Sequence, residues 1–443
     1  MQAGSHSEGQ IESVVYKVAW RVMPLMVIGV FFNFVDRANL SFAANTMNRD
    51  LGFSQTVYGF AAGLFFLAYL IFGIPSNLML QRFGSRIWFA RIMITWGLIS
   101  SATALVSNAL ELNIARFALG MAEAGYAPGI LVFCNIWFPQ KYRAQTMSFV
   151  FLAPSIAGVI TAPISGFILE LDGAMGFKGW QWLFFLEGLP TVVLGFIFLW
   201  LFPSRPADAK WLTKEECTTL TEAVERDNRE AERIGGSSLV QALLNMRVIL
   251  LCLANMLVAA CIAVTFAFLP QIIKATGAIA TASSFLATIP YLSGAIAVWI
   301  VGGLSKRYSA HDIMAPLASG MAGLGFAGTA ILGTSPWAVA TLTVCACGVS
   351  AFVPLFWALP QKYLTGTSAA VGFALINSVA GLGGFFGTTI FGWVTDLTGN
   401  YSRSLWLSAG AAALAGLLCI AAARIPWTSA RRGIAVGLSR TLD

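Results

Sequence analysis

The chain has 443 residues, of which 57% are hydrophobic and 11% are charged. Soluble domains carry about 25% charged residues, so this composition excludes an ordinary soluble protein and is typical of a polytopic α-helical membrane protein. The net charge of +7 does not indicate a nucleic-acid-binding protein, because the cations lie in short loops and tails and form no basic stripe with interleaved aromatic residues. We therefore expect the chain to contact a lipid bilayer and no nucleic acid.

Twelve apolar runs follow one another along the chain, and a helix of about 20 such residues crosses a bilayer. The runs cover residues 20–44, 56–79, 87–107, 112–137, 144–169, 181–202, 247–270, 281–304, 313–333, 337–359, 369–394 and 403–424. One long polar stretch separates the first six runs from the last six. The predicted fold class is an all-α polytopic membrane protein with twelve transmembrane helices in two six-helix bundles, residues 20–202 and 246–424, joined by a linker at residues 203–245.

The positive charges of the short loops predict the orientation of the chain. The more basic loops follow the second, fourth, eighth and tenth runs and contain Arg82, Arg86, Lys141, Arg143, Lys306, Arg307 and Lys362. Loops rich in Lys and Arg stay on the cytoplasmic side of a membrane. We therefore expect the linker, the N-terminal tail (residues 1–19) and the C-terminal tail (residues 425–443) to be cytoplasmic. Residues 1–10 are polar and show no cleavable signal peptide, so the first run is expected to target the chain.

An internal repeat supports the division into halves. Residues 137–142 (WFPQKY) end the fourth run and residues 357–363 (WALPQKY) end the tenth, with their prolines 221 positions apart. Duplicated halves of the same orientation are related by a pseudo-twofold axis along the membrane normal, and substrate binds between them. The repeat therefore predicts a site at the interface of the two bundles.

The first apolar run contains an acid and a base side by side, Asp36 and Arg37. A charge at the centre of a membrane helix costs about 2.5–3.5 kcal/mol on insertion scales, so such residues usually face a polar cavity and have a function there. Asn33, Arg37 and Ser41 repeat every four residues and share one stripe of a helix, whereas Asp36 lies about 100° from Arg37. The alternatives are a helix end among the lipid headgroups or a structural ion pair.

The fourth run adds a second pair of charges, Arg116 and Glu123. They are seven positions apart, almost two helical turns, and therefore share a face on which Gly120 leaves room for a neighbouring helix or a ligand. Facing the first run, they would complete a set of four intramembrane charges. A purely structural network is the alternative, although buried ion pairs are poor stabilisers. Arg116 also lies near a loop, from where its side chain could reach the membrane surface.

Several motifs resemble the major facilitator superfamily. Residues 73–86 (GIPSNLMLQRFGSR) resemble its cytoplasmic loop signature, with Gln81 where the superfamily usually has an acid, which weakens any charge latch built on that acid. Within the superfamily, nearly the whole chain resembles the anion:cation symporter family through motifs that begin at Asp36, Pro75, Arg116, Trp137, Trp182, Pro203 and Ala374. The amino-acid sequence around residues 180–182 and 206–213 is most similar to that of the bacterial tartrate, phthalate and hydroxyphenylacetate permeases of that family.

The resemblance implies roles for individual residues. Asp36 and Glu123 would carry the coupled protons, Arg37 would bind the substrate carboxylate, and Arg116 would modulate the acid on its own helix. Tyr69, Trp357 and Asn377 match substrate contacts of related sugar-acid carriers. Each of the three also has a structural interpretation, as a packing aromatic residue for Tyr69 and Trp357 or an interhelical hydrogen bond for Asn377. This chain has Phe34 where those carriers have a tyrosine, so a polyhydroxy sugar acid loses one hydroxyl contact.

The side-chain chemistry agrees with these roles. An arginine binds a carboxylate through two parallel hydrogen bonds and stays charged when buried. We expect ionised Asp36 to be the counter-charge of Arg37, so that protonation of Asp36 would release the guanidinium for the substrate.

The expected function is proton-coupled symport of a small organic carboxylate into a bacterial cell across the cytoplasmic membrane, by alternating access of the two bundles. Protons are the expected coupling ion, with no cofactor or metal, and the expected state is a monomer. An exporter or antiporter on the same fold is the alternative. An enzyme is disfavoured because the chain has only two histidines, His6 and His311, and seven cysteines without metal-ligand spacing.

Overall fold

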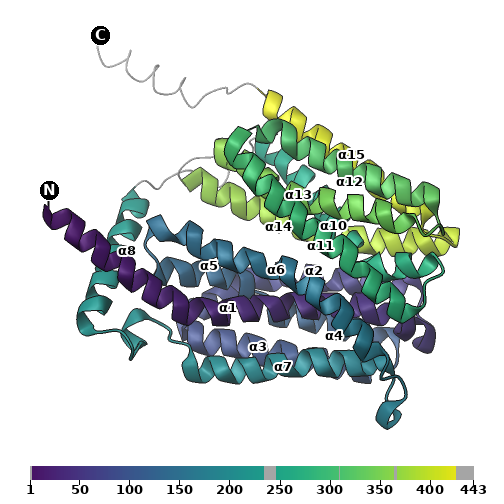
Figure 1. The fold of residues 1–443 in the computed structure, drawn as a ribbon, viewed down its shortest axis with the longest axis horizontal. Coiled ribbons are helices and arrows are strands. Elements are labelled where there is room, and N and C mark those ends of the chain that lie inside the picture. Colours follow the sequence, from purple (N-terminus) through teal and green to yellow (C-terminus); the bar gives the residue numbers. More distant parts are fainter. Residues whose placement is uncertain (1, 234–245, 309, 364–366, 426–443) are drawn as a thin grey trace.

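The computed structural model describes residues 2–233, 246–308, 310–363 and 367–425. Within these residues the chain is helical and has no strand (Figure 1). The first group of long helices contains α1 (Gln2–Leu51), α2 (Gln55–Phe83), α3 (Ser85–Ala102), α4 (Ala109–Glu123), α5 (Tyr126–Trp137), α6 (Gln140–Leu169) and α7 (Gly179–Leu201). The second contains α10 (Met246–Ala275), α11 (Ala280–Tyr308), α12 (His311–Leu332), α13 (Ala338–Tyr363), α14 (Thr367–Thr398) and α15 (Ser402–Arg424).

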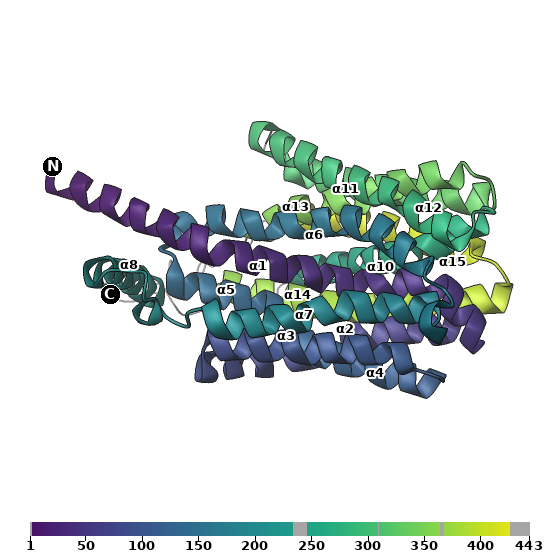
Figure 2. The ribbon, with the colours of Figure 1, turned by 60° about the horizontal axis from the view of Figure 1, so that its bottom comes forward.

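The predicted fold class is confirmed. Among the described residues, 11 helical segments are long and apolar enough to cross a membrane, with α4 and α5 counted as one segment. The predicted run at residues 144–169 lies within α6, which has 30 residues. The two groups lie side by side with their helices roughly parallel (Figures 1 and 2). The boundaries predicted for the two bundles and the tails stay predictions, and residues 426–443 of the C-terminal tail lie outside the described residues.

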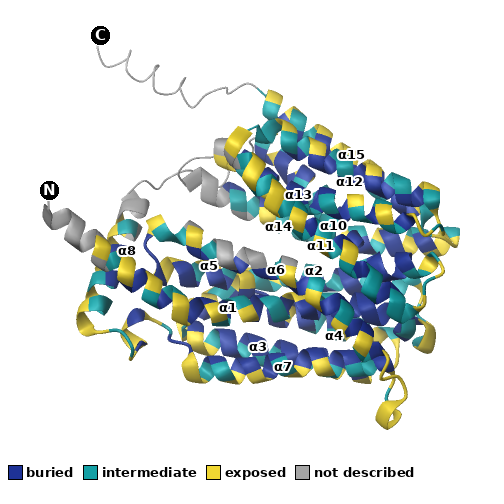
Figure 3. Ribbon diagram, viewed as in Figure 1, coloured by how far each residue is buried: buried dark blue, intermediate teal, exposed yellow. Residues whose placement is uncertain are grey.

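The outer surface of the helices is apolar. Trp20, Trp200, Trp299 and Leu324 are each more than 70% exposed, and buried residues gather where helices face one another (Figure 3). Exposing these side chains to water would be unfavourable, whereas lipid tails are as apolar as the side chains themselves. The distribution is therefore the one expected for a protein surrounded by a bilayer.

The linker contains a helix, α8 (Lys214–Arg233), that holds the first turns of α1. Val14, Val18 and Leu220 are buried in the same hydrophobic cluster, so the last part of the predicted tail packs against α8 as part of α1. The Lys17 ammonium donates to both oxygens of Glu216, at 2.8 and 2.7 Å. Lys17 and the N–H of Thr213 lower the pKa of Glu216. This contact is therefore present at neutral pH and is lost as the pH falls through that lowered value.

The two groups of helices touch through α2 with α14, α6 with α11, and α1 with α10. Glycines allow the close approach of α2 and α14: a Cβ at Gly59 would lie 2.3 Å from the carbonyl oxygen of Thr388, and one at Gly392 would lie 2.1 Å from that of Gln55. These contacts lie near the end of the molecule where α1 ends and α2 begins. We call it the Leu51–Gln55 end.

A carboxylate of one group caps a helix of the other at this end. Asp396 of α14 accepts hydrogen bonds from the N–H groups of Gln55 and Thr56, at 3.0 and 2.6 Å, and from the Thr56 hydroxyl at 2.5 Å. The first N–H groups of a helix have no partner within the helix and carry a partial positive charge. The N-terminal helix cap of α2 is Ser54, which accepts from Val57. Asp396 therefore completes this cap from across the interface.

We expect Asp396→Ala to weaken the closed Leu51–Gln55 end, because loss of a cap costs about 0.5–2 kcal/mol. A cysteine introduced at Phe60, whose ring lies 6.0 Å from that of Phe385 across the same interface, should then react faster with a maleimide. Asp172→Ala is the matched control, because Asp172 caps Gly179 within one group of helices. Equal labelling in both variants would show that Asp396 does not hold the interface.

Candidate functional site

An ion pair between α1 and α4 is the centre of the candidate site. Arg37 Nε donates to Glu123 Oε2 at 3.1 Å, and Asn33 Nδ2 donates to the same oxygen at 2.6 Å. Asn33 and Arg37 thus share a helix stripe, as the sequence predicts. The Glu123 side chain is fully buried, whereas that of Arg37 is 27% exposed. Arg37 is therefore the member of the pair whose side chain is partly open to solvent.

Aromatic rings surround the Arg37 guanidinium. Its central carbon lies 5.0 Å from the ring centres of Phe65 and Tyr69 and 5.6 Å from that of Phe34. A guanidinium near ring faces is stabilised by the π-electrons, and such contacts hold its plane in one orientation. The structure therefore brings Tyr69 together with Arg37, as expected for a shared site.

The α4 helix ends directly after Glu123. Gly125 has φ of +92°, the left-handed region that favours glycine, and a new helix, α5, begins at Tyr126. The C-terminal end of a helix carries a partial negative charge. Glu123 and the end of α4 are therefore both favourable neighbours for the Arg37 cation.

Gly120 makes room for a neighbouring helix rather than for a ligand. A Cβ at Gly120 would lie 2.3 Å from the carbonyl oxygen of Phe65 on α2. Since Phe65 and Tyr69 contact Arg37, the close approach of α4 to α2 places the ring faces and Glu123 around one guanidinium.

Asp36 points to a different set of helices. Asn39 Nδ2 donates to Asp36 Oδ1 at 3.1 Å and lies 3.2 Å from the Ser100 hydroxyl on α3. The other end of the Asn39 amide, Oδ1, accepts a hydrogen bond from Arg116 Nη2 at 3.4 Å. Asp36 is fully buried, and its Oδ2 has no hydrogen-bond partner among the described residues. Asp36 is therefore linked to Arg116 through Asn39 and also interacts with the Glu123 carboxyl group, whereas the ion-pair partner of Arg37 is Glu123.

This geometry corrects the expected counter-charge of Arg37. Consecutive residues of a helix point about 100° apart, so Arg37 faces α2 and α4 while Asp36 faces α3. The resident acid of Arg37 is Glu123. Arg116 is 2% exposed and its guanidinium lies 5.6 Å from the ring of Phe184, so it does not reach the membrane surface.

Trp357 and Asn377 lie in the second group of helices. Trp357 of α13 is half-buried, with its ring 5.7 Å from that of Phe356 and 6.0 Å from that of Phe373, and Asn377 of α14 is exposed. The contacts of the described residues connect neither of them to Arg37. Their role as substrate contacts therefore stays a prediction.

The candidate site residues predicted from the sequence do not include a buried acid on α7. Glu187 is 4% exposed, and Ser165 donates to its Oε1 at 2.7 Å. The available signal was a carboxylate inside an apolar run, which is expensive in a membrane.

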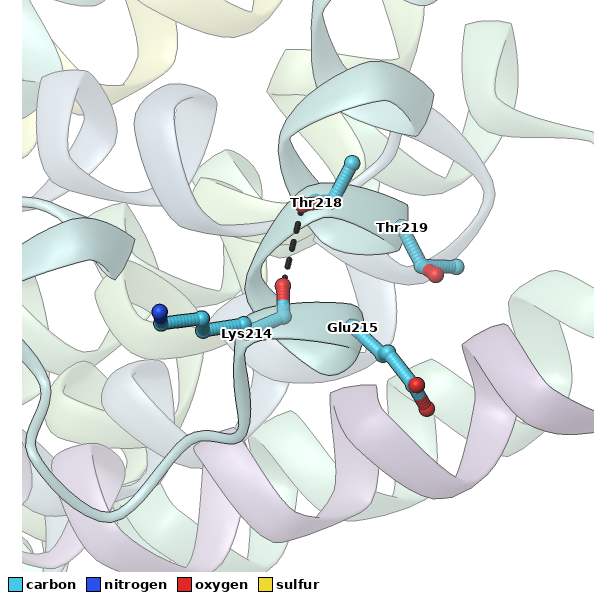
Figure 4. A pocket seen from close by; sticks show the side chains of 4 residues that line it. All are labelled: Lys214, Glu215, Thr218 and Thr219. Atoms are coloured by element: carbon cyan, nitrogen blue, oxygen red, sulfur yellow. Dashed lines mark hydrogen bonds between the residues drawn. The ribbon is translucent and has the colours of Figure 1, made fainter.

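The surface depression of Figure 4 is formed by Lys214, Glu215, Thr218 and Thr219 of α8. The hydrogen bond drawn there, from the Thr218 hydroxyl to the Lys214 carbonyl, is internal to the helix. This depression belongs to the linker and contains none of the candidate site residues.

A helical bundle that buries charges inside membrane-spanning segments defines the chain as a polytopic membrane transporter. Residues 26–388 match the family described as the Major Facilitator Superfamily. The chain belongs to this superfamily, as the motifs predict, and is a multi-pass transporter rather than an enzyme.

Similar sequences and solved structures are also those of transporters. A protein of Agrobacterium vitis named "Putative tartrate transporter" is 38% identical over 93% of this chain and 91% of its own. A "Quinolone resistance transporter" of Acinetobacter baumannii is 37% identical over 89% of this chain and 91% of its own. The partially occluded inward open conformation of the xylose transporter XylE from E. coli, at 15% identity, superimposes with a TM-score of 0.73 over 93% of this chain and 98% of that chain, which shows the shared fold.

We expect Gly120→Ala to separate α2 from α4, because the added methyl group would overlap the Phe65 carbonyl. Overpacking of this kind costs about 1–3 kcal/mol, so thermal unfolding in detergent should begin at a lower temperature. Gly73→Ala on α2 is the control, since nothing lies within 4 Å of a Cβ there. Equal unfolding temperatures of the two variants would show that α2 and α4 can move apart to accommodate the methyl group without loss of stability.

Proposed function

We propose that this chain is a proton-coupled symporter that imports a small organic carboxylate by alternating access of its two bundles. The observation that carries the proposal is the partly exposed Arg37 side chain, paired with the fully buried carboxylate of Glu123 between two helical segments that are long and apolar enough to cross a membrane. The relative named for tartrate supports an organic anion as the cargo.

Arg37 is the group that would bind the substrate carboxylate. Its Nε donates to Glu123, and the two terminal nitrogens of a guanidinium can donate two parallel hydrogen bonds to a carboxylate. The rings of Phe34, Phe65 and Tyr69 would contact the rest of the molecule, and Trp357 and Asn377 would close the site from the other bundle. The substrate class is an acid resembling tartrate, phthalate, hydroxyphenylacetate or a sugar acid.

Glu123 couples the proton to the substrate in this proposal. An ionised Glu123 neutralises Arg37, so a substrate carboxylate would add a second anion beside one cation in a medium of low dielectric constant. A proton on Glu123 removes that competition. Proton and anion should then bind with reciprocal positive coupling, plausibly about 1–3 kcal/mol. Asp36 would carry a second proton, and Arg116 would modulate it through Asn39.

The orientation completes the proposal. With both termini in the cytoplasm of a bacterium and the chain in its inner membrane, the Leu51–Gln55 end faces the outside. Asp396 and the glycines of α2 and α14 would then form the outer gate, which must open before substrate can enter. A proton that enters with an anion reduces the charge moved, so the membrane potential does not oppose uptake. The transporter would act as a monomer.

An exporter or antiporter is the second candidate, favoured by the relative named for quinolone resistance. Transport in proteoliposomes with proton gradients of either direction separates the two. Symport predicts that substrate accumulates on the side toward which protons flow. Antiport predicts accumulation on the opposite side.

We expect Arg37→Lys to lose most substrate affinity although the positive charge is kept, because an ammonium group cannot form the paired hydrogen bonds of a guanidinium. The ligand is the acid that gives the largest thermal shift in a panel of tartrate, phthalate, hydroxyphenylacetate and galactonate. Calorimetric titration of that acid measures the loss. An affinity close to that of the unaltered protein would remove Arg37 from the binding role.

The pH dependence of binding should distinguish the two acids. Affinity in the unaltered protein should rise as the pH falls through the range in which Glu123 takes up a proton. Glu123→Gln should bind tightly at every pH in that range, whereas Asp36→Asn should keep the pH dependence. Titrations of both variants at several pH values measure this. If Asp36→Asn alone lost the pH dependence, Asp36 would be the coupling residue at the binding step.

A further inference from the structure

A third buried carboxyl group lies on α7, outside the site described above. Ser165 of α6 donates to Glu187 Oε1 at 2.7 Å, and Glu187 Oε2 has no hydrogen-bond partner among the described residues. The residue is 4% exposed in the middle of the helix. An unpaired buried carboxylate is costly, so such a group tends to hold a proton.

Glu187 belongs to the same polar region as Asp36. Next to it, a Cβ at Gly188 would lie 2.6 Å from the Ser101 hydroxyl of α3, so the two helices nearly touch there. Ser101 follows Ser100, which contacts Asn39 of the Asp36 group. Asp36 and Glu187 are close enough to interact electrostatically.

Few charges face this pair. From α1 the titratable group facing Glu187 is Asp36, and from α6 the polar group is the Ser165 hydroxyl. From α4, Arg116 lies over Phe184, almost one turn before Glu187 on α7. Arg37, the neighbour of Asp36 on α1, is engaged by Glu123. Glu123 of α4 also interacts with Asp36. Asp36, Glu123 and Glu187 are thus three carboxyl groups beside the two guanidinium groups of Arg37 and Arg116, and charge balance favours one proton among the three.

We propose that Glu187 is a further proton-carrying residue of the transport cycle, one that exchanges a proton with Asp36 along the contact of α1, α3 and α7. The proton leaves Glu187 Oε2 and binds the Asp36 carboxylate, so Glu187 becomes ionised as Asp36 becomes neutral. The charge of the pair is unchanged, and the Ser165 hydroxyl stabilises the new carboxylate. This path avoids Arg37, and it rests on the proposed proton symport.

The test is the proton-to-substrate stoichiometry of Glu187→Gln in proteoliposomes, obtained from the gradient at which net flux reverses. We expect the variant to move one proton fewer per substrate, because Asp36 can then no longer exchange its proton through Glu187, while counterflow exchange, which needs binding and rocking alone, is retained. Glu170→Gln makes the same change at an exposed residue at the end of α6 and should leave the stoichiometry unchanged.

The outcomes separate the two proposals. If the unaltered protein couples protons and Glu187→Gln keeps its stoichiometry, the inference is wrong and the symport proposal stands. If the unaltered protein does not couple protons, both fall. Should Glu187→Gln not fold, Glu187→Asp keeps a carboxyl group one methylene shorter and should shift the pH profile of proton-driven uptake. An unshifted profile, compared with the unaltered protein, would overturn the inference.

Discussion

The pairing of Arg37 with Glu123 is the interaction on which the account of this transporter depends. A guanidinium and a carboxylate inside a bilayer are each expensive, and together they gain little over an apolar pair. Their geometry is informative because the two ends of the pair differ: the acid is fully enclosed, while the base remains 27% exposed. In the proposed mechanism, an incoming anion would compete for the base and a proton would neutralise the acid.

The surrounding fold holds this pair in place. The α4 helix ends at Glu123, the left-handed Gly125 starts a new helix, and Gly120 lets α4 approach the backbone of α2. The same use of small residues recurs between the two bundles, where Gly59 and Gly392 let α2 and α14 meet. Close backbone contacts of this kind pack well in a membrane without requiring large side chains to move. They are suited to helices that shift as rigid bodies.

The sequence predicted much of the fold and less of the site. Apolar runs and a repeat of polar loop residues were enough for the helices, because lipid requires each segment to satisfy its own backbone. The charged residues were found because an ionised side chain inside an apolar run is costly in a membrane. Their partners were not, since adjacent residues such as Asp36 and Arg37 face different neighbours, and helix packing decides which ones. The packing of α1 around residues 14–18 against α8 depends on contacts between residues about 200 positions apart, as for Lys17 and Glu216.

The most direct test of the central claim is the proton balance of binding itself. The purified protein, in weakly buffered detergent solution at a series of starting pH values from neutral to alkaline, is mixed with the carboxylic acid from the panel that stabilises it most, and the pH change is recorded. If Glu123 must be neutral for Arg37 to receive the substrate, the protein takes up protons as the anion binds and the solution becomes more alkaline. Binding with no proton uptake at any pH where Glu123 is ionised in the empty protein would contradict the account.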